Sequence, residues 1–96
     1  MEAIKHLSLL GLRVRDKVTG LDGIVAAISF DLYGCVQATL NSGLDKDGKL
    51  RDSYWFDVSR LTILSDTPVM DVPNFVSGPV ARGEQGGDSK PLMRSV

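Results

Sequence analysis

Residues 12–30, LRVRDKVTGLDGIVAAISF, decide the fold class, because they contain two strand patterns joined by a glycine-rich turn. Apolar and basic residues alternate between residues 11 and 18, which predicts a strand with one buried and one wet face. The apolar members are Leu12, Val14 and Val18, and the basic members are Arg13, Arg15 and Lys17. Asp16 interrupts the apolar face just before Thr19-Gly20. We therefore expect its carboxylate to accept hydrogen bonds from turn N–H groups rather than to be a buried charge.

Four further strands are predicted up to residue 64. Residues 23–30 (GIVAAISF) form an apolar run typical of a central strand that is buried on much of both faces. Residues 35–40, 53–58 and 61–64 have shorter strand patterns. The polar residues 41–49 (NSGLDKDGK) predict a projecting hairpin end. At residues 57–61 the sequence predicts one helical turn, in which the Asp57 carboxylate caps an N–H of Ser59 or Arg60.

Five short strands with a helical turn before the last predict an all-β fold, a small five-stranded SH3-like barrel over residues 11–65. Closure into a barrel would remove the exposed edges that so small a sheet otherwise has. Residues 1–10 (MEAIKHLSLL) are compatible with helix or strand, since ten residues make a marginal helix without packing. We expect them to cover an open end of the barrel or to contact a neighbouring subunit.

The composition changes after residue 65. All four prolines and four of the ten glycines lie there. Because proline fixes φ and removes a backbone donor, residues 66–96 are predicted to form an extended C-terminal arm. Apolar side chains recur along this arm, which a flexible linker would not need. We expect them to bind a partner; they are Val69, Met70, Phe75, Val76, Leu92 and Met93.

Charge and composition limit the classes of function. The chain of 96 residues is 43% apolar and has a formal net charge of −1. Residues 1–65 contain eight basic and eight acidic side chains, so no broad electrostatic capture of nucleic acid is indicated. No apolar run approaches the ~20 residues of a membrane span. Glu2 stands where a signal peptide would be basic, and we expect neither export by a signal peptide nor a membrane partner.

No catalytic or metal-binding signature is present. With Cys35 as the one cysteine and His6 as the one histidine, a zinc cluster has too few soft ligands. We expect Cys35 to be a buried, inert thiol. The Asp45-Lys-Asp47-Gly48 stretch fails as a calcium loop, because its glycine is fourth rather than sixth and Phe56 occupies the twelfth position. The sequence predicts no enzyme activity and no cofactor.

The consecutive aromatic residues Tyr54, Trp55 and Phe56 cannot share one strand face. Either Trp55 or the pair Tyr54 and Phe56 points inward. An exposed Trp55, together with the basic residues Arg13, Arg15 and Lys17, would suit nucleic-acid binding. The same pattern is also explained without nucleic acid, if the aromatic residues pack in the core and the basic residues lie on a solvent-exposed strand face.

Several motifs resemble a known group of proteins. They are VRDKVTGLDGIV from residue 14, DLYGC from residue 31 and WFDVSRL from residue 55. The pattern resembles small proteins encoded by tailed bacteriophages and prophages, which combine an Asp-Lys-(Val/Ile)-Thr-Gly start with a Tyr-x-Gly-Cys turn, a Lys-Asp-Gly loop and a Trp-Phe-Asp segment. The resemblance covers residues 11–64. The opening also resembles KOW-type and other SH3-like barrels. It implies no enzymatic activity and no catalytic residues.

The resemblance implies a non-enzymatic structural or interaction protein. We expect a bacteriophage virion component, such as a capsid decoration, cement or connector-associated protein, which docks on other phage structural proteins by its barrel and its arm. The expected location is the virion or the host cytoplasm. Two alternatives remain open: a nucleic-acid-binding SH3/KOW-like module, and a small phage accessory protein that inhibits a host factor.

Overall fold

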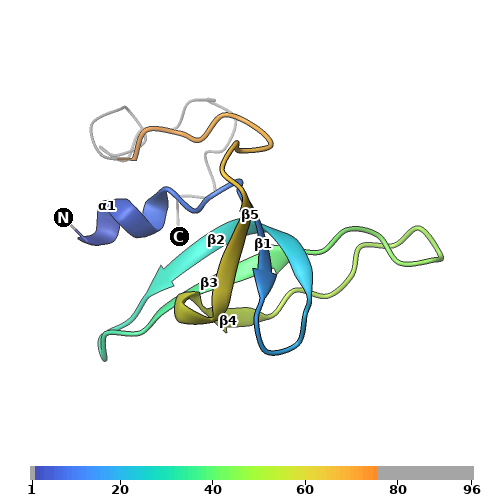
Figure 1. Ribbon diagram of the computed structural model, residues 1–96, viewed down its shortest axis with the longest axis horizontal. Helices are drawn as coiled ribbons and strands as arrows, with labels where there is room; N and C mark the ends of the chain where they lie inside the picture. The colour runs from blue at the N-terminus through green and yellow to red at the C-terminus, as the bar shows by residue number, and fades with distance from the viewer. Residues whose placement is uncertain (1, 76–96) are drawn as a thin grey trace, which may run out of the picture.

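The computed structural model describes residues 2–75 (Figure 1). Five antiparallel strands form one sheet in the order β4-β3-β2-β1-β5, which confirms the predicted small all-β fold with five strands. The strands are β1 (Arg13–Asp16), β2 (Asp22–Phe30), β3 (Val36–Asn41), β4 (Trp55–Asp57) and β5 (Leu61–Ser65). A helix α1 (Glu2–Leu7) precedes them, and a single 3-10 turn η1 (Val58–Arg60) joins β4 to β5.

The core lies on one face of this sheet. Strand β2 is central and pairs with β1 on one side and β3 on the other. Alternation along the strands brings six apolar residues together, namely Leu12, Val14, Val25, Ala38, Leu40 and Phe56. At Gly23 the strands β2 and β3 come so close that a Cβ would lie 2.9 Å from the Leu40 Cβ. A side chain at this position would displace the core residue beside it.

The sheet is open. Strands β4 and β5 form its two edges, and no pairing joins them within residues 2–75. The closed barrel expected from the sequence is therefore not shown. The sheet is nevertheless curled, because only the three residues of η1 lead from one edge strand to the other (Figure 1).

Four local predictions need correction. Val18 is exposed in the β1–β2 turn, because β1 ends at Asp16. The Asp57 carboxylate makes no cap hydrogen bond to η1; instead it accepts a long hydrogen bond from the Ser59 hydroxyl. Cys35 is exposed beside the β2–β3 turn, not buried. Strand β2 is buried on one face only, since Val25 is buried and its neighbour Ala26 is exposed.

The first residues form a helix that lies on the sheet. The His6 ring of α1 makes an edge-to-face contact with Phe30, with 6.1 Å between ring centroids. Leu9 and Leu10, which follow the helix, pack against the core cluster. Residues 2–10 thus lie over one end of the sheet.

The segment after β5 folds back onto the same end of the molecule. The Val69 N–H donates to the Gly11 carbonyl oxygen at 2.9 Å. Pro68 lies so close to Gly11 that a Cβ there would be 3.1 Å from the Pro68 Cβ, and Gly11 has a φ of +83°. A glycine is therefore required where the two segments meet. Figure 1 shows the segment passing alongside α1 before the described residues end at Phe75.

Candidate interaction surface

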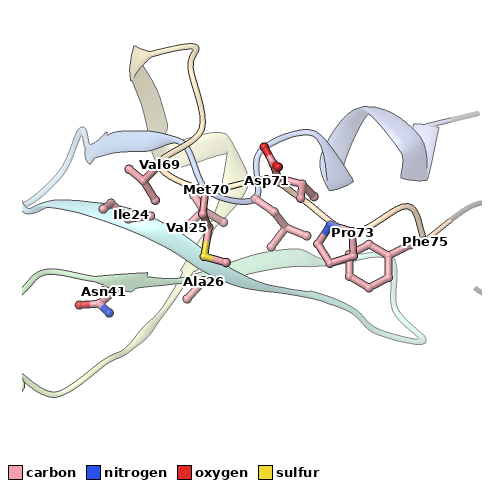
Figure 2. Close-up of a pocket in the computed structure, with 12 residues that line it drawn as sticks. Ile24, Val25, Ala26, Asn41, Val69, Met70, Asp71, Pro73 and Phe75 are labelled. Carbon is pink, nitrogen blue, oxygen red and sulfur yellow. The ribbon is translucent and has the colours of Figure 1, made fainter. Parts of the chain in front are cut away.

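Residues 69–75 and the central strand β2 border a groove of about 470 Å³ (Figure 2). Ile24, Val25 and Ala26 of β2 form one wall. Val69, Met70 and Phe75 form the opposite wall and remain partly or largely exposed. The structure thus brings together three of the six residues predicted to bind a partner. The other three, Val76, Leu92 and Met93, lie outside the described residues.

A second, more polar hollow continues the groove along the sheet. It measures about 300 Å³ and is lined by Arg13, Asp22 and Ser42 among others. Ile24 and Asn41 line both hollows, so they lie side by side. The surface therefore changes from apolar near residues 69–75 to polar near Arg13. Sequence patterns missed the sheet wall of the groove, because Ile24 and Ala26 belong to a run that was predicted to be core.

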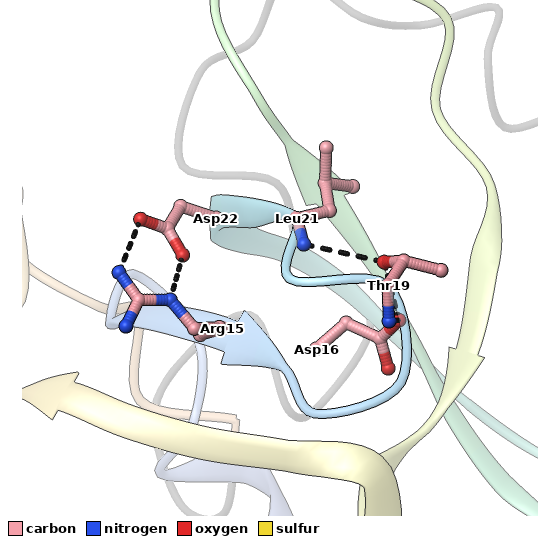
Figure 3. A network of polar contacts seen from close by, with 5 residues as sticks. All are labelled: Arg15, Asp16, Thr19, Leu21 and Asp22. Carbon is pink, nitrogen blue, oxygen red and sulfur yellow. Dashed lines mark hydrogen bonds and ion pairs between the residues drawn. The ribbon is translucent and has the colours of Figure 1, made fainter.

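The basic residues of β1 are largely engaged within the chain. Arg15 forms a two-point ion pair with Asp22, with 2.6 Å between Nε and Oδ1 and 2.9 Å between Nη2 and Oδ2 (Figure 3). This contact raises the pKa of Arg15 and lowers the pKa of Asp22. The Lys17 ammonium group donates to the Ser59 carbonyl oxygen at 3.4 Å. Arg13 lines the polar hollow. A stripe of three available cations is therefore not present on β1.

Trp55 lies on β4, a different strand from that of Arg13 and Arg15. On β4, Trp55 pairs with Thr39 of β3, whereas Phe56 pairs with Ala38 of β3 and is buried in the core. Phe56 alone points inward; Trp55 is half exposed and Tyr54 is exposed, so the predicted inward pair of Tyr54 and Phe56 holds only for Phe56. Strands β2 and β3 separate β4 from β1, so Trp55 does not stand beside Arg13 or Arg15 in the sheet.

The β2–β3 turn presents two large apolar side chains that sequence patterns did not single out. Leu32 is 90% exposed and Tyr33 is 86% exposed. The turn is fixed by the Asp31 carboxylate, which accepts from the N–H groups of Tyr33 at 2.9 Å and Cys35 at 2.8 Å. The Asp31 charge also raises the pKa of the Cys35 thiol, so this thiol is less reactive than an ordinary one.

The hairpin between β3 and β4 projects from the molecule, as predicted from residues 41–49 (Figure 1). The Asp45 carboxylate accepts from the N–H groups of Asp47 and Lys49 at its tip. An isolated bridge pairs Leu44 with Leu50, and both side chains are exposed. The hairpin is therefore a second fixed loop that displays apolar groups.

A buried ion pair holds the β1–β2 turn against η1. Asp16 is fully buried and accepts from Arg60 twice, at 2.8 Å from Nε and 2.7 Å from Nη2. It also accepts from the Thr19 N–H at 2.9 Å and from the Thr19 hydroxyl at 2.6 Å. The Arg60 guanidinium lies 5.3 Å from the centroid of the Phe56 ring. The predicted turn acceptor is confirmed, but the prediction that Asp16 is not a buried charge is wrong.

These arrangements bring no cluster of metal ligands together within residues 2–75. In residues 2–75 no group of three or more histidine, cysteine or acidic side chains is placed to hold a metal ion. No helix in that range is long and apolar enough to cross a bilayer. The surface features described above are apolar groups and paired charges.

Comparisons with known proteins give no match. No family model matches the chain, and neither the curated proteins nor the solved structures yield a similar protein. The resemblance to small bacteriophage proteins therefore stays a prediction from the motifs alone.

Proposed function

We propose that this chain is a non-enzymatic interaction protein that docks on protein subunits of an assembly. The observation that carries the proposal is the groove beside β2, where Val69, Met70 and Phe75 leave apolar surface open to water. Contiguous exposed apolar surface of this kind marks interaction sites in soluble proteins. The resemblance in residues 11–64 favours a bacteriophage virion as the assembly, with the chain as a capsid decoration, cement or connector-associated component.

The architecture supports an SH3-like barrel as the docking module. The fifth strand returns to pair with β1, β2 is the long central strand, and a 3-10 turn joins the last two strands. The ion pair between Asp16 and Arg60 links the Asp-Lys-Val-Thr-Gly motif to the Trp-Phe-Asp segment. Two of the segments on which the resemblance rests therefore meet in space and stabilise one another.

Apolar burial would supply most of the binding free energy. A protein interface of standard size buries about 800 Å² on each partner, at roughly 25 cal/mol for each Å² of apolar area. The groove and the β2–β3 turn offer large exposed side chains for this purpose; they are Leu32, Tyr33, Val69, Met70 and Phe75. Binding of this kind depends weakly on salt, in contrast to the binding of nucleic acid.

The two alternative functions, nucleic-acid binding and inhibition of a host factor, are supported to different degrees. Nucleic-acid binding ranks second, because the side chains of Arg15 and Lys17 already have partners and Trp55 lies on another strand. Inhibition of a host factor would use the same apolar surface. The identity of the captured protein distinguishes that alternative from a structural role.

A substitution in the groove tests the proposal. Met70→Glu places a charge where we expect an apolar contact, and it should lower retention of the partner by about tenfold or more, since hot-spot losses exceed about 1.4 kcal/mol. Retention is measured by capture from cells that produce the particle, with mass spectrometry of the bound proteins. Leu44→Glu is the matched control, because Met70 is 72% exposed and Leu44 is 58% exposed.

Both variants should melt at the wild-type temperature, since neither side chain is in the core. Equal retention by Met70→Glu and the wild-type chain would remove the groove from the docking surface. A loss in Leu44→Glu with none in Met70→Glu would move the contact to the long hairpin.

A further inference from the structure

The outer edge of β5 is unpaired in the described part of the chain. Strand β5 pairs with β1 along one side and is the last strand of the sheet. Its side chains from Thr62 onward are exposed, including the large apolar residues Ile63 and Leu64. A row of backbone N–H and C=O groups beside exposed apolar side chains is a template for pairing with another strand.

The register shows that the core is uncovered at this edge. Ile63 stands opposite Val14, and directly opposed residues share one face of a sheet. Val14 is fully buried in the core, yet Ile63 is 49% exposed. Within residues 2–75, no segment fully covers the core-facing side of β5.

Strand β5 also lacks two of the devices that keep edge strands apart. Its sequence, LTILS, has no charged residue and no proline. A shift in register opposite Arg13 and Val14 is present, but it lies toward the end of the strand and leaves Leu61, Thr62 and Ile63 in regular pairing. The exposed strand is thus suited to pairing.

We propose that β5 pairs in antiparallel orientation with β5 of a second copy of this chain, so that two sheets join into one continuous sheet. The two-fold axis would pass through Ile63. Two-fold dimers with self-complementary contacts are the commonest symmetric assemblies. This inference is independent of the proposed docking function, since the groove uses other residues.

The charges at the ends of β5 select the second copy and its orientation. Arg60 and Asp66 each lie three residues from Ile63. Antiparallel pairing about Ile63 would bring Arg60, the last residue of η1 in one copy, close to Asp66, which follows β5 in the other, and this contact would occur twice. Parallel pairing would oppose like charges, which is unfavourable. Arg60 keeps donors for this contact, because Asp16 uses two of its nitrogens and its side chain is 36% exposed.

The oligomeric state of the full chain tests the proposal. Sedimentation or light scattering, over roughly 1–100 μM, should show the mass of two chains. Asp66→Arg should weaken the dimer at least tenfold by opposing two arginines, a change of about 1.4 kcal/mol or more. Asp52→Arg makes the same charge change at an exposed position of the long hairpin and should leave the dimer intact.

A cross-link tests the register. On a Cys35→Ser background, Ile63→Cys should give a disulfide-linked dimer, because opposed residues of antiparallel strands have Cα atoms about 4.5–5.5 Å apart, within disulfide range. Leu44→Cys is the control and should form no disulfide-linked dimer under the same oxidation. A wild-type chain that is monomeric up to about 100 μM, an Asp66→Arg dimer as tight as wild type, or a dimer without the Ile63→Cys cross-link would each overturn the proposal.

Discussion

Replacing Asp16 with alanine is expected to lower the thermal midpoint by roughly 10 °C or more, because it removes a fully buried carboxylate that accepts hydrogen bonds from Arg60 and Thr19 in a small domain. The Arg60 guanidinium and the Thr19 N–H both lose their acceptor in this variant. The β1–β2 turn would also lose its attachment to η1, the 3-10 turn that joins the two edge strands. Asp16→Asn should fall between wild type and Asp16→Ala, since an amide oxygen can still accept from Thr19.

Thermal unfolding followed by circular dichroism measures this effect. Asp22→Ala is the matched control, because Asp22 also pairs with an arginine but the pair is about half exposed. Exposed ion pairs contribute little to stability, so the control should melt close to wild type. An Asp16→Ala midpoint equal to that of Asp22→Ala would contradict the structural role of the buried pair.

Loss of stability in acid is the second large effect that we expect. The hydrogen bonds from Arg60, followed by those from Thr19, hold the pKa of Asp16 well below its usual range. In the unfolded chain the same carboxyl group has its ordinary pKa of about 3.9. The unfolded state therefore binds a proton more readily than the folded state. The stabilisation is complete above about pH 5 and is lost progressively as the pH falls below about 4.

The midpoint should therefore be nearly constant between about pH 7 and pH 5 and fall steeply below about pH 4. Thermal scans of the wild-type chain and of Asp16→Asn across this range measure the contribution of the buried carboxylate. The variant should show a distinctly shallower fall, the remainder coming from exposed carboxylates such as Asp22 and Asp45, whose pKa values are also lowered. Identical acid profiles for the two chains would show that Asp16 does not carry the effect.

Local patterns in the sequence predict most of the strands. The alternation before Asp16, the β-branched run that became β2 and the polar hairpin after β3 all lie where expected, because each signal is contained in a few neighbouring residues. The position of the helical turn between the last two strands was also predicted. Its cap was not, since the Asp57 carboxylate turns to Ser59 instead of a backbone N–H.

The largest error concerns a contact between distant parts of the chain, and a smaller one concerns the residue at which β3 begins. Asp16 is buried only because Arg60, 44 residues later, supplies its counter-charge. Cys35 is exposed because β3 begins one residue after it, at the end of the turn. No local pattern contains this information.

The interaction surface was predicted in part. The apolar residues Val69, Met70 and Phe75 were predicted to bind a partner from their composition alone, and all three line the groove. The groove that they form with β2 depends on the fold-back of the chain at Gly11 and Val69, which follows from a hydrogen bond between segments far apart in sequence. The exposed edge of β5 was not foreseen, because the closed barrel that the strand pattern predicted would have covered it.

The central claim is tested most directly by measuring whether a captured protein partner stays bound when the salt concentration of the wash is raised. Baits of residues 1–96 and 1–75 are incubated with an extract of cells that produce the particle and are washed at about 0.1 M and 1 M salt. The second bait ends at Phe75 so that the groove stays intact. If the chain docks by apolar burial, bait 1–96 retains a protein partner in 1 M salt, and any loss in bait 1–75 measures the contribution of residues 76–96. If both baits instead retain nucleic acid at 0.1 M salt and release it at 1 M salt, the chain is an electrostatic binder and the proposed function is wrong.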